Sequence, residues 1–479
     1  MDPIFELHID LPPRGSRTIR HSLLSQLRQA ILDGRLKAGA ALPATRTLAR
    51  RLAISRNTVI ATYDRLAGEG YLIVLAGSGA RVAPLPVSSS VPLAAPSGSS
   101  PDPRLPSRWH EAEITIPFFL QLRYDFRVGA PDISRFPFFV WQRLQTRAVR
   151  ALSREAPGYG APQGHLALRD AIAGYVSVTR AVACVADDVI VTSGAQQAFD
   201  LIARVFVNPQ ERTRVAVENP GYPPLRATFA AQGAEIVPVP VDAQGICIDD
   251  CPQDVSIVAV TPSHQFPLGI AMSPTRRETL LAFAAACGAI LIEDDYDGEF
   301  RFGGHSLEAL RTLDRSGSVF YVGTFSKSML PALRMGYIVA PRWARDALVA
   351  ARHLCDGFPA HVTQVALAAF IAEGHLTRHV RAMRRVYSDR KSALVRACDR
   401  WGRGRIEVIP ALAGLHVALT TSSDADPDLP TRLREAGVGA EPLQRYAVAN
   451  TRWTGMALGL GAILGRDIDP AIAALANAL

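Results

Sequence analysis

The chain of 479 residues is 48% apolar and 20% charged, which is enough material for two or more domains with large cores. Its longest apolar stretch, near residues 279–292, is too short to span a bilayer, and its first residues contain no apolar segment of a secretory signal. The net charge is +8, and residues 1–85 hold 12 Lys and Arg against 6 Asp and Glu, so most of the excess lies there. We therefore expect a cytoplasmic protein without membrane spans whose first segment binds an anionic partner, with nucleic acid the first candidate.

Six cysteines are scattered along the chain, at Cys184, Cys247, Cys251, Cys287, Cys355 and Cys398. Cys247 and Cys251 are close together, but no second pair completes a zinc site. We expect all six to be reduced thiols, and we expect no metal site.

Residues 17–85 have the pattern of three short helices followed by a hairpin. The apolar positions at helical spacing are Leu23, Leu24, Leu27, Ala30 and Ile31, then Leu48, Ala49 and Leu52, then Val59, Tyr63 and Leu66. Asp33-Gly34 ends the first helix, and Ser55 can cap the third. Residues 71–83 alternate as a strand, turn on Gly77-Ser78-Gly79 and return, which predicts a hairpin.

The second and third predicted helices form a helix-turn-helix candidate, in which the third helix enters the major groove of DNA. The residues at its start are Ser55, Arg56, Asn57 and Thr58. Arg pairs with guanine, Asn with adenine, and Ser or Thr with phosphate. The arginines that would flank the DNA backbone on the preceding helix are Arg46, Arg50 and Arg51. From the helix pattern alone, a small bundle with a solvated basic face is an equal alternative.

The string LPATRTLARRLAISRNTVIATYDRLAGEGYL (42–72) is much more specific than that pattern, and it resembles the winged helix-turn-helix of the GntR family of bacterial regulators. The resemblance implies that the protein binds double-stranded operator DNA. It also implies that the contacts come from Arg46, Arg56, Asn57, Thr58 and the wing glycine Gly77.

Composition changes abruptly between Pro84 and Ser107, where 7 of 24 residues are Pro and 7 are Ser. Such a segment cannot form a core and is typical of an extended linker with some stiffness. We therefore divide the chain into a DNA-binding domain over 1–85, a linker over 86–117 and a large domain over 118–479.

The large domain has the alternating predicted strands and helices that are typical of an α/β fold. Short apolar strands are predicted at 189–194, 214–222, 256–263, 289–295 and 319–324, with longer amphipathic stretches between them. This order predicts a mostly parallel sheet with helices on both faces. Ligands bind such sheets beyond the carboxyl ends of the strands.

Lysine is rare in this chain, and the 52 basic residues include only Lys37, Lys327 and Lys391. Lys can form a Schiff base and Arg cannot, so each lysine is informative. Lys327 lies in YVGTFSKSMLPALRMGY, with Arg334 seven positions on, and the strand LIEDDYDGEF ends in carboxylates and a tyrosine. An amine, an acid and a cation are what pyridoxal phosphate (PLP) needs, although a solvated loop lysine is the alternative.

With these strands placed, the large domain resembles the fold-type I aminotransferases over nearly its whole length. The resemblance implies that Lys327 forms the Schiff base with PLP, that Asp294 pairs with the pyridine nitrogen, and that Tyr296 hydrogen-bonds the phenolic oxygen. Periodicity alone leaves open which of Glu293, Asp294 and Asp295 faces the ring, and the resemblance favours Asp294.

The segment TSGAQQAF places small residues at a strand-to-helix junction, where free backbone N–H groups bind anions. By the same resemblance, the groups that contact the phosphate of PLP belong to Gly194, Ala195, Gln196, Thr324 and Arg334. Tyr222 in ENPGY corresponds to the residue that stacks on the PLP ring, with a core tyrosine as the alternative.

Two departures from the aminotransferase pattern qualify an enzymatic interpretation. TPSHQFPLG has Phe266 where the family carries an Asn that contacts the ring oxygen, and His264 just before it is a cofactor-binding candidate. MALGLG has Ala457 where many members carry an Arg that clamps the substrate carboxylate. The nearest cations are Arg445 and Arg452, our effector-binding candidates, and an ordinary surface arginine is the alternative for each.

The GntR-type reader, the Pro-rich linker and the altered aminotransferase domain together match the MocR subfamily, and EDDYDGEF, TPSHQFP and GTFSK are spellings typical of it. The resemblance implies a PLP-binding transcriptional regulator with at most partial transamination chemistry. It also implies a domain-swapped homodimer in which an amino compound, or PLP itself, shifts the geometry of the two readers on DNA. Two alternatives stay open: a working aminotransferase with a fused DNA-binding module, and a GntR regulator whose large domain no longer binds PLP.

Overall fold

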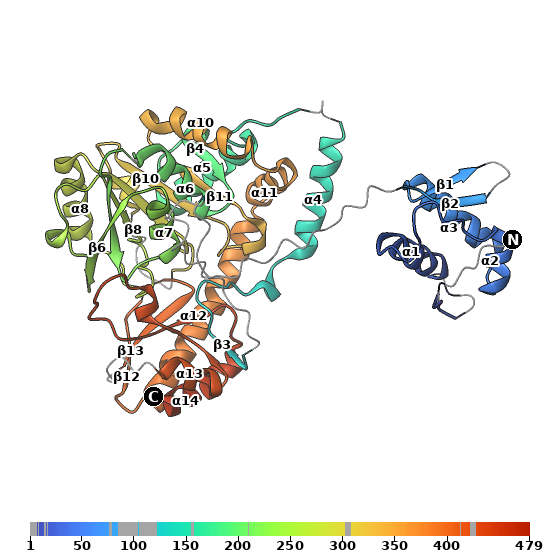
Figure 1. Ribbon diagram of the computed structural model, residues 1–479. Coiled ribbons are helices and arrows are strands. Elements are labelled where there is room, and N and C mark those ends of the chain that lie inside the picture. Colours follow the sequence, from blue (N-terminus) through green and yellow to red (C-terminus); the bar gives the residue numbers. More distant parts are fainter. Residues whose placement is uncertain are drawn as a thin grey trace. The chain divides into compact units, whose positions relative to one another are not determined.

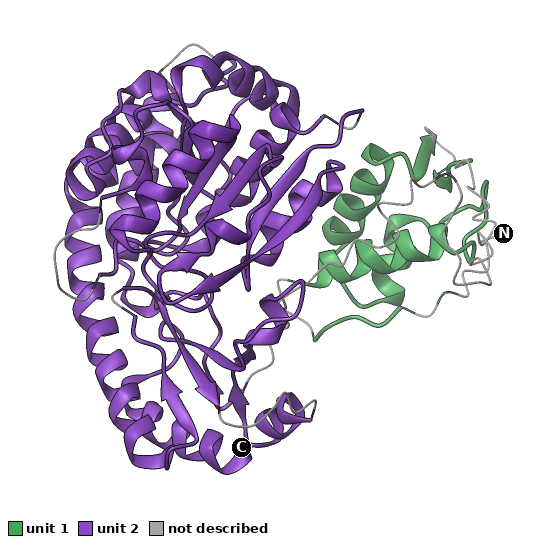
Figure 2. Ribbon diagram, turned by 90° about the vertical axis from the view of Figure 1, so that its left-hand side faces the viewer, with its two compact units in different colours: residues 1–102 green, residues 103–479 purple. Residues whose placement is uncertain are grey.

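The computed structural model describes residues 7, 9–13, 16, 18–75, 79–84, 104, 122–154, 158–208, 210–301, 308–411, 413–421 and 428–479. The chain forms two compact units, residues 1–102 and 103–479 (Figure 2). The predicted linker over 86–117 lies outside the described residues except for Arg104, and so does Gly77 of the predicted wing. No helix of the described residues is long and apolar enough to cross a membrane.

The first unit contains the three helices and the antiparallel strand pair that the sequence predicts. Its elements are α1 (Ile19–Leu32), α2 (Thr45–Arg51), α3 (Arg56–Gly68), β1 (Leu72–Leu75) and β2 (Gly79–Val82). α1 ends at Asp33, and Gly34 follows with a φ of +78°, a left-handed conformation that favours glycine. The helices bury the predicted apolar faces in one core, which includes Leu27, Leu48 and Val59.

The second unit is organised around a sheet of eight strands (Figure 1). In spatial order these are β4 (Val189–Thr192), β11 (Gly336–Val339), β10 (Val319–Thr324), β9 (Ile290–Asp295), β8 (Ile257–Val260), β5 (Arg214–Asn219), β6 (Glu235–Asp242) and β7 (Gly245–Ile246). The five strands from β10 to β6 are parallel, whereas β11 runs antiparallel to both of its neighbours and β7 to β6. The predicted mostly parallel sheet is therefore confirmed.

Helices cover both faces of this sheet, as the continuous burial along strands such as β4, β8 and β10 requires. On β10, Phe320 and Val322 pack in one cluster with α6 (Ala195–Phe206), α7 (Pro223–Ala231) and α10 (Arg345–Asp356). Val319 of the same strand packs on the opposite face with α8 (Pro274–Cys287), and Tyr321 packs there with α5 (Leu166–Arg180) and α11 (His361–Ala372).

A second, antiparallel sheet follows the long helix α12 (His375–Trp401) and was not predicted (Figure 1). Its strands are β12 (Ile406–Val408), β13 (His416–Thr421), β16 (Gly455–Gly459) and β15 (Glu441–Pro442), in that spatial order. Beside it, α14 (Ile468–Ala478) packs on α12, and β14 (Val438–Gly439) pairs in parallel with β3 (Tyr124–Asp125). The start of the large unit thus lies against its C-terminal part.

Candidate functional site

The residues predicted to bind PLP come together at one edge of the large sheet. β9 and β10 are parallel neighbours with Val322 opposite Asp294, so Asp294 and the loop carrying Lys327 leave the sheet at the same edge. Gly336 of β11 pairs with Thr324 on one side and with Thr192 on the other. The loop after Thr192, which leads into α6, therefore lies level with the end of β10.

Lys327 is half-buried, and its Nζ donates a hydrogen bond of 2.8 Å to the carbonyl oxygen of Gly129. Burial lowers the pKa of Lys327, while the charges of Asp297 and Asp294 oppose that shift. A lowered pKa increases the share of neutral amine, which is the form that attacks an aldehyde.

Asp294 differs from the acids on either side of it. Its carboxyl group is 4% exposed, its Oδ1 has no hydrogen-bond partner, and burial raises its pKa well above the usual value, with Asp295 the next cause. Asp295 instead pairs with the guanidinium of Arg180 at 2.6 Å, and Glu293 accepts two backbone N–H groups at the start of α9 (Leu310–Leu313). A buried carboxyl without a partner fits a cationic N–H donor such as a pyridinium.

Two tyrosines lie beside these acids. Tyr222 precedes α7, and its ring meets that of Phe266 edge-on with centroids 5.3 Å apart. Burial raises the pKa of Tyr222 to about 12, and the charge of Asp294 adds to that shift, which places the two side chains near each other. The hydroxyl of Tyr296 donates to the carbonyl oxygen of His264 at 2.9 Å and lies 2.8 Å from its Nδ1.

The predicted phosphate-binding groups surround the start of α6. Gly194 has a φ of +79°, and a Cβ built there would lie 2.9 Å from Nη2 of Arg334, so only glycine lets the guanidinium approach this closely. The backbone N–H groups of Ala195 and Gln196 occupy the first turn of the helix, where they have no partner within it. The side chain of Gln196 instead donates to Thr228, so only its backbone can serve an anion here.

A hydroxyl pair faces the same place from the end of β10. Oγ1 of Thr324 lies 3.0 Å from Oγ of Ser326 and accepts the backbone N–H of that residue at 3.1 Å. Ser326 was not predicted, although its place in GTFSK, one residue before Lys327, is a signal that could have found it.

Gly129 is a second residue that the sequence did not single out. It has a φ of +78°, and a Cβ there would lie 2.8 Å from Nζ of Lys327. Two glycines at and just after the end of β16 let the segment around Gly129 pack closely against them. A Cβ on Gly459 would lie 1.9 Å from the carbonyl oxygen of Arg127, and a Cβ on Gly461 would lie 1.8 Å from the carbonyl oxygen of Ala130. Close backbone packing therefore holds the carbonyl oxygen of Gly129 next to the amine of Lys327.

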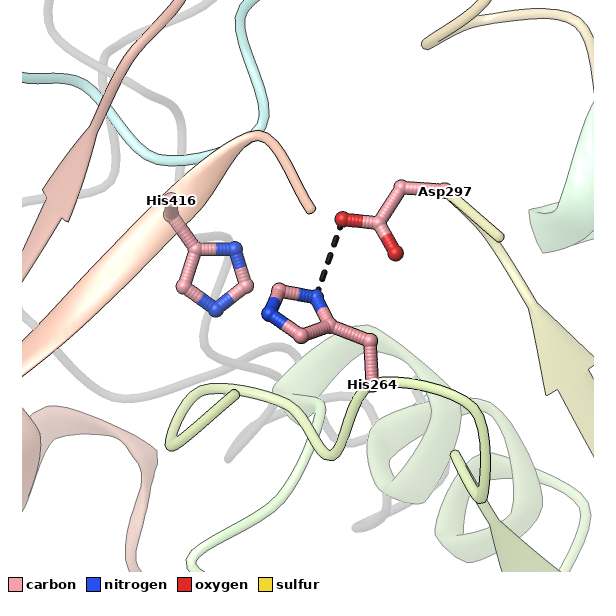
Figure 3. Close-up of side chains that lie close together, drawn as sticks. All are labelled: His264, Asp297 and His416. Atoms are coloured by element: carbon pink, nitrogen blue, oxygen red, sulfur yellow. Dashed lines mark hydrogen bonds and ion pairs between the residues drawn. The ribbon is translucent and has the colours of Figure 1, made fainter. Parts of the chain in front are cut away.

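His264 also contacts two residues that were not predicted, Asp297 and His416. Its Nδ1 lies 3.0 Å from Oδ2 of Asp297, and its ring centroid is 4.6 Å from that of His416 (Figure 3). Gly414 makes room for this arrangement, since a Cβ there would lie 1.9 Å from the His264 ring.

The predicted effector arginines lie at the surface. Arg445 pairs with Glu441 at 3.5 Å, and Arg452 lies over the ring of Trp453, with its guanidinium carbon 5.1 Å from the centroid. A third cation, the half-buried Arg226 of α7, was not predicted. Its Nη1 donates to the carbonyl oxygen of Tyr446 at 3.1 Å, and it lines a small cavity whose other residues are Val217, Glu218, Gly221, Tyr222, Leu225, Ala259, Val260 and Thr261.

In the first unit, the start of α3 presents the predicted DNA-contacting side chains. Ser55 caps the helix, because its Oγ accepts the backbone N–H of Thr58 at 3.1 Å. Arg56 and Asn57 are exposed in the first turn, and Arg46 is exposed on α2. The Nε of Arg56 donates to the hydroxyl of Thr45 at 3.4 Å, which links the two helices.

Two family profiles match the chain: residues 131–454 match aminotransferase class I and II, and residues 20–82 match the bacterial regulatory proteins of the gntR family. The probable rhizopine catabolism regulatory protein MocR of Rhizobium meliloti is 37% identical over 468 residues, which cover 96% of this chain and 93% of that protein. The HTH-type pyridoxine biosynthesis transcriptional regulator PdxR of Corynebacterium glutamicum is 32% identical over 460 residues, covering 95% of each chain.

Solved structures resemble the large unit. Kynurenine aminotransferase of Pyrococcus horikoshii has a TM-score of 0.69 and 25% identity, covering 75% of this chain and 91% of that chain. LysN, an alpha-aminoadipate aminotransferase of Thermus thermophilus solved with N-(5'-phosphopyridoxyl)-L-leucine, has a TM-score of 0.68 and 26% identity, covering 74% and 91%.

Proposed function

Because this chain belongs to the MocR subfamily of GntR-type transcriptional regulators, we propose that its large domain binds PLP and that occupancy of that pocket controls DNA binding by the first domain. The ligand that acts there is an amino compound or PLP itself. When bound, PLP supplies an aldehyde for amines and an electron-withdrawing ring.

The observation that carries this proposal is the pairing of Lys327 with Asp294. Lys327 lies near buried carboxylates that lack a full set of partners, and burial lowers its pKa, which favours the reactive neutral amine. Asp294 would hold the pyridine nitrogen, and in doing so it would gain the partner that its Oδ1 lacks.

The remaining residues would fix the ring and its phosphate. Arg334, Thr324 and the backbone of Gly194 to Gln196 supply charge and donors for the phosphate. Tyr222 would stack on the ring, and Tyr296, already fixed by His264, would lie on the side of its phenolic oxygen.

An acidic effector would need a cation across from the amine. Arg445 and Arg452 remain our candidates, and each would have to leave its present neighbour, Glu441 or Trp453, to turn inward. Arg226 joins them because it already lies beside Tyr222. A guanidinium binds a carboxylate or sulfonate in a bidentate manner, which a single lysine cannot do.

On DNA, Arg56 and Asn57 would read bases in the major groove, and Arg46, Ser55 and Thr58 would contact the backbone. We expect a domain-swapped homodimer, because two readers match the two half-sites of an operator.

Borohydride reduction tests the cofactor site. The purified full chain should carry a reducible PLP adduct that Lys327→Ala abolishes, whereas Lys391→Ala should retain it. Lys391 is a matched control, because burial also lowers its pKa and its Nζ donates to a backbone carbonyl oxygen, that of Ala411. An adduct that persists in Lys327→Ala contradicts the site, and rapid multiple-turnover transfer to a keto acid by the parent favours an active aminotransferase.

A further inference from the structure

Asp297 and His416 have no place in the proposed function, yet both are buried beside the PLP pocket with His264. The three side chains come from separate parts of the chain, after β8, after β9 and at the start of β13, and each is 1% exposed. One ligand-type atom from each lies within 4.8 Å of the other two. Figure 3 shows the rings of His264 and His416 next to each other, with Asp297 contacting His264 on the side away from His416.

Each of the three side chains has one buried polar atom without a hydrogen-bond partner among the described residues. The buried atoms without a hydrogen-bond partner in the described part of the chain include Nε2 of His264, Nδ1 of His416 and Oδ1 of Asp297. Nε2 of His416 lies 2.9 Å from the carbonyl oxygen of Pro267, which can only accept, so this nitrogen carries the proton and Nδ1 presents a lone pair.

The distance between His264 and Asp297 also matches the spacing of two ligand atoms on one metal ion. In a tetrahedral zinc site with bonds of about 2.0–2.1 Å, neighbouring ligand atoms lie roughly 3.3 Å apart. Nδ1 of His264 and Oδ2 of Asp297 are 3.0 Å apart, close to that spacing. Both atoms also have another neighbour that an ion would compete with: Oδ2 accepts the backbone N–H of Leu415, and Nδ1 lies 2.8 Å from the hydroxyl of Tyr296. Two imidazoles and a carboxylate are a donor set that suits Zn²⁺ and its neighbours.

We propose that His264, Asp297 and His416 bind a divalent transition-metal ion such as Zn²⁺. Metal binding itself does not require PLP, so it can be tested whether or not the proposed function holds.

The test is calorimetric titration of the metal-free full chain with Zn²⁺, with and without PLP, and with Co²⁺ as a spectroscopic probe. We expect one strong site per protomer in both states. Because changes next to metal ligands already weaken binding about 10–100-fold, His416→Ala and Asp297→Asn, which remove ligands, should weaken it by at least that factor. His379→Ala, which removes another half-buried imidazole of the large unit, should not.

Asp297→Asn preserves the shape of the side chain, so it serves if His416→Ala fails to fold, and thermal melting of each variant verifies folding. The Co²⁺ spectrum distinguishes the ligands, since thiolates give intense charge-transfer bands and nitrogen or oxygen ligands do not. Absence of a strong site, a site unaffected by both substitutions, or thiolate bands that point to cysteines would each overturn the proposal.

Discussion

Glu293, Asp294 and Asp295 are consecutive acids of β9, and their surroundings give them different roles. Alternate residues of a strand face opposite sides, so Asp294 points away from its two neighbours. Glu293 and Asp295 have partners that stabilise their charge, the start of α9 and Arg180 respectively. Oδ1 of Asp294 has no hydrogen-bond partner among the described residues, and burial disfavours its charge more than Lys327 favours it, so its burial without ligand is unfavourable for the folded protein.

This contrast predicts opposite effects of one substitution at adjacent positions. In the PLP-free protein at pH 7, Asp294→Asn should raise the melting temperature, because it removes a buried carboxyl group whose ionisation is disfavoured. Asp295→Asn should destabilise by about 3–5 kcal/mol, because it leaves the buried Arg180 without its partner. With PLP present, Asp294→Asn should in turn lose most of the ligand-induced stabilisation. Scanning fluorimetry with and without PLP measures all of these shifts.

The pH dependence of that stability has a defined sign. Burial raises the pKa of Asp294 above 3.8, so the folded protein holds this proton more tightly than the unfolded chain. The stability that results is complete below the unfolded pKa and is lost as the pH rises toward the folded one. The advantage of Asp294→Asn over the parent should therefore grow from about pH 4 upward, and an advantage that is constant with pH would contradict this assignment.

At the residue scale, the sequence predicted the side chains that lie within named strings, and it missed those whose roles depend on distant contacts. Asp294 lies at the end of one predicted strand and Lys327 shortly after the next, so their proximity could be inferred from the carboxyl edge of a parallel sheet. Asp297 and His416 meet only because β13 of the second sheet returns to the end of β9. No pattern in the sequence predicts that β13 contacts the end of β9.

Among the secondary-structure elements, β16 positions the amine from outside the pocket. Its glycines allow the segment 127–130 to lie against it, and that segment carries the carbonyl bonded to Lys327. Gly459→Ala should therefore lower PLP affinity although position 459 does not touch the predicted cofactor residues. Gly465→Ala, where a Cβ meets nothing within 4 Å, is the matched control. Titration with PLP followed by visible absorbance, together with melting temperatures, would show whether binding falls more than stability.

α3 gives a second prediction at this scale. Arg56→Ala should cost about 1–3 kcal/mol in operator binding and relax the preference at one base pair, because an arginine at the start of the recognition helix reads guanine. Arg65→Ala removes the same charge from the last turn of the same helix, where Arg65 pairs with Glu69, and should change binding little. Fluorescence anisotropy on operator and random DNA makes the measurement. An equal loss on both would assign Arg56 to phosphate instead.

Within the large sheet, the sequence predicted the edge strand β4 and the parallel strands β5, β8, β9 and β10, but not β6, β7 or β11. β6 contains Pro238 and Pro240, and proline within a run argues against a strand. The two prolines are two residues apart, so both of their backbone nitrogens face the same side of the strand. β5 is hydrogen-bonded to β6 on the opposite side, so the missing N–H groups do not interrupt that pairing. The second sheet was missed because its strands are short and separated by long stretches of chain, so their pairing depends on tertiary contacts.

At the scale of the whole molecule, the charge is distributed according to function. The first domain carries most of the net charge of +8 and must displace counterions from DNA, so binding should weaken steeply with salt. The large domain contributes the ligand pocket and has no predicted DNA contacts. Regulation therefore requires that a ligand in one domain alter how the other engages its operator, and the number of contacts made by each reader need not change.

This reasoning predicts how an effector acts on DNA binding. If the ligand alters the placement of two readers in a homodimer, it should change affinity for an operator with two half-sites by about 1–3 kcal/mol, the usual range of allosteric coupling. Affinity for a single half-site and the chemistry of each contact should stay the same, because one reader alone has no spacing to satisfy. Anisotropy titrations on both DNAs, with and without a candidate amino acid, provide the comparison, and Lys327→Ala should lose the ligand response on the full operator. An equal change on the half-site would mean that the ligand acts on α3 itself and not on the pairing of the readers.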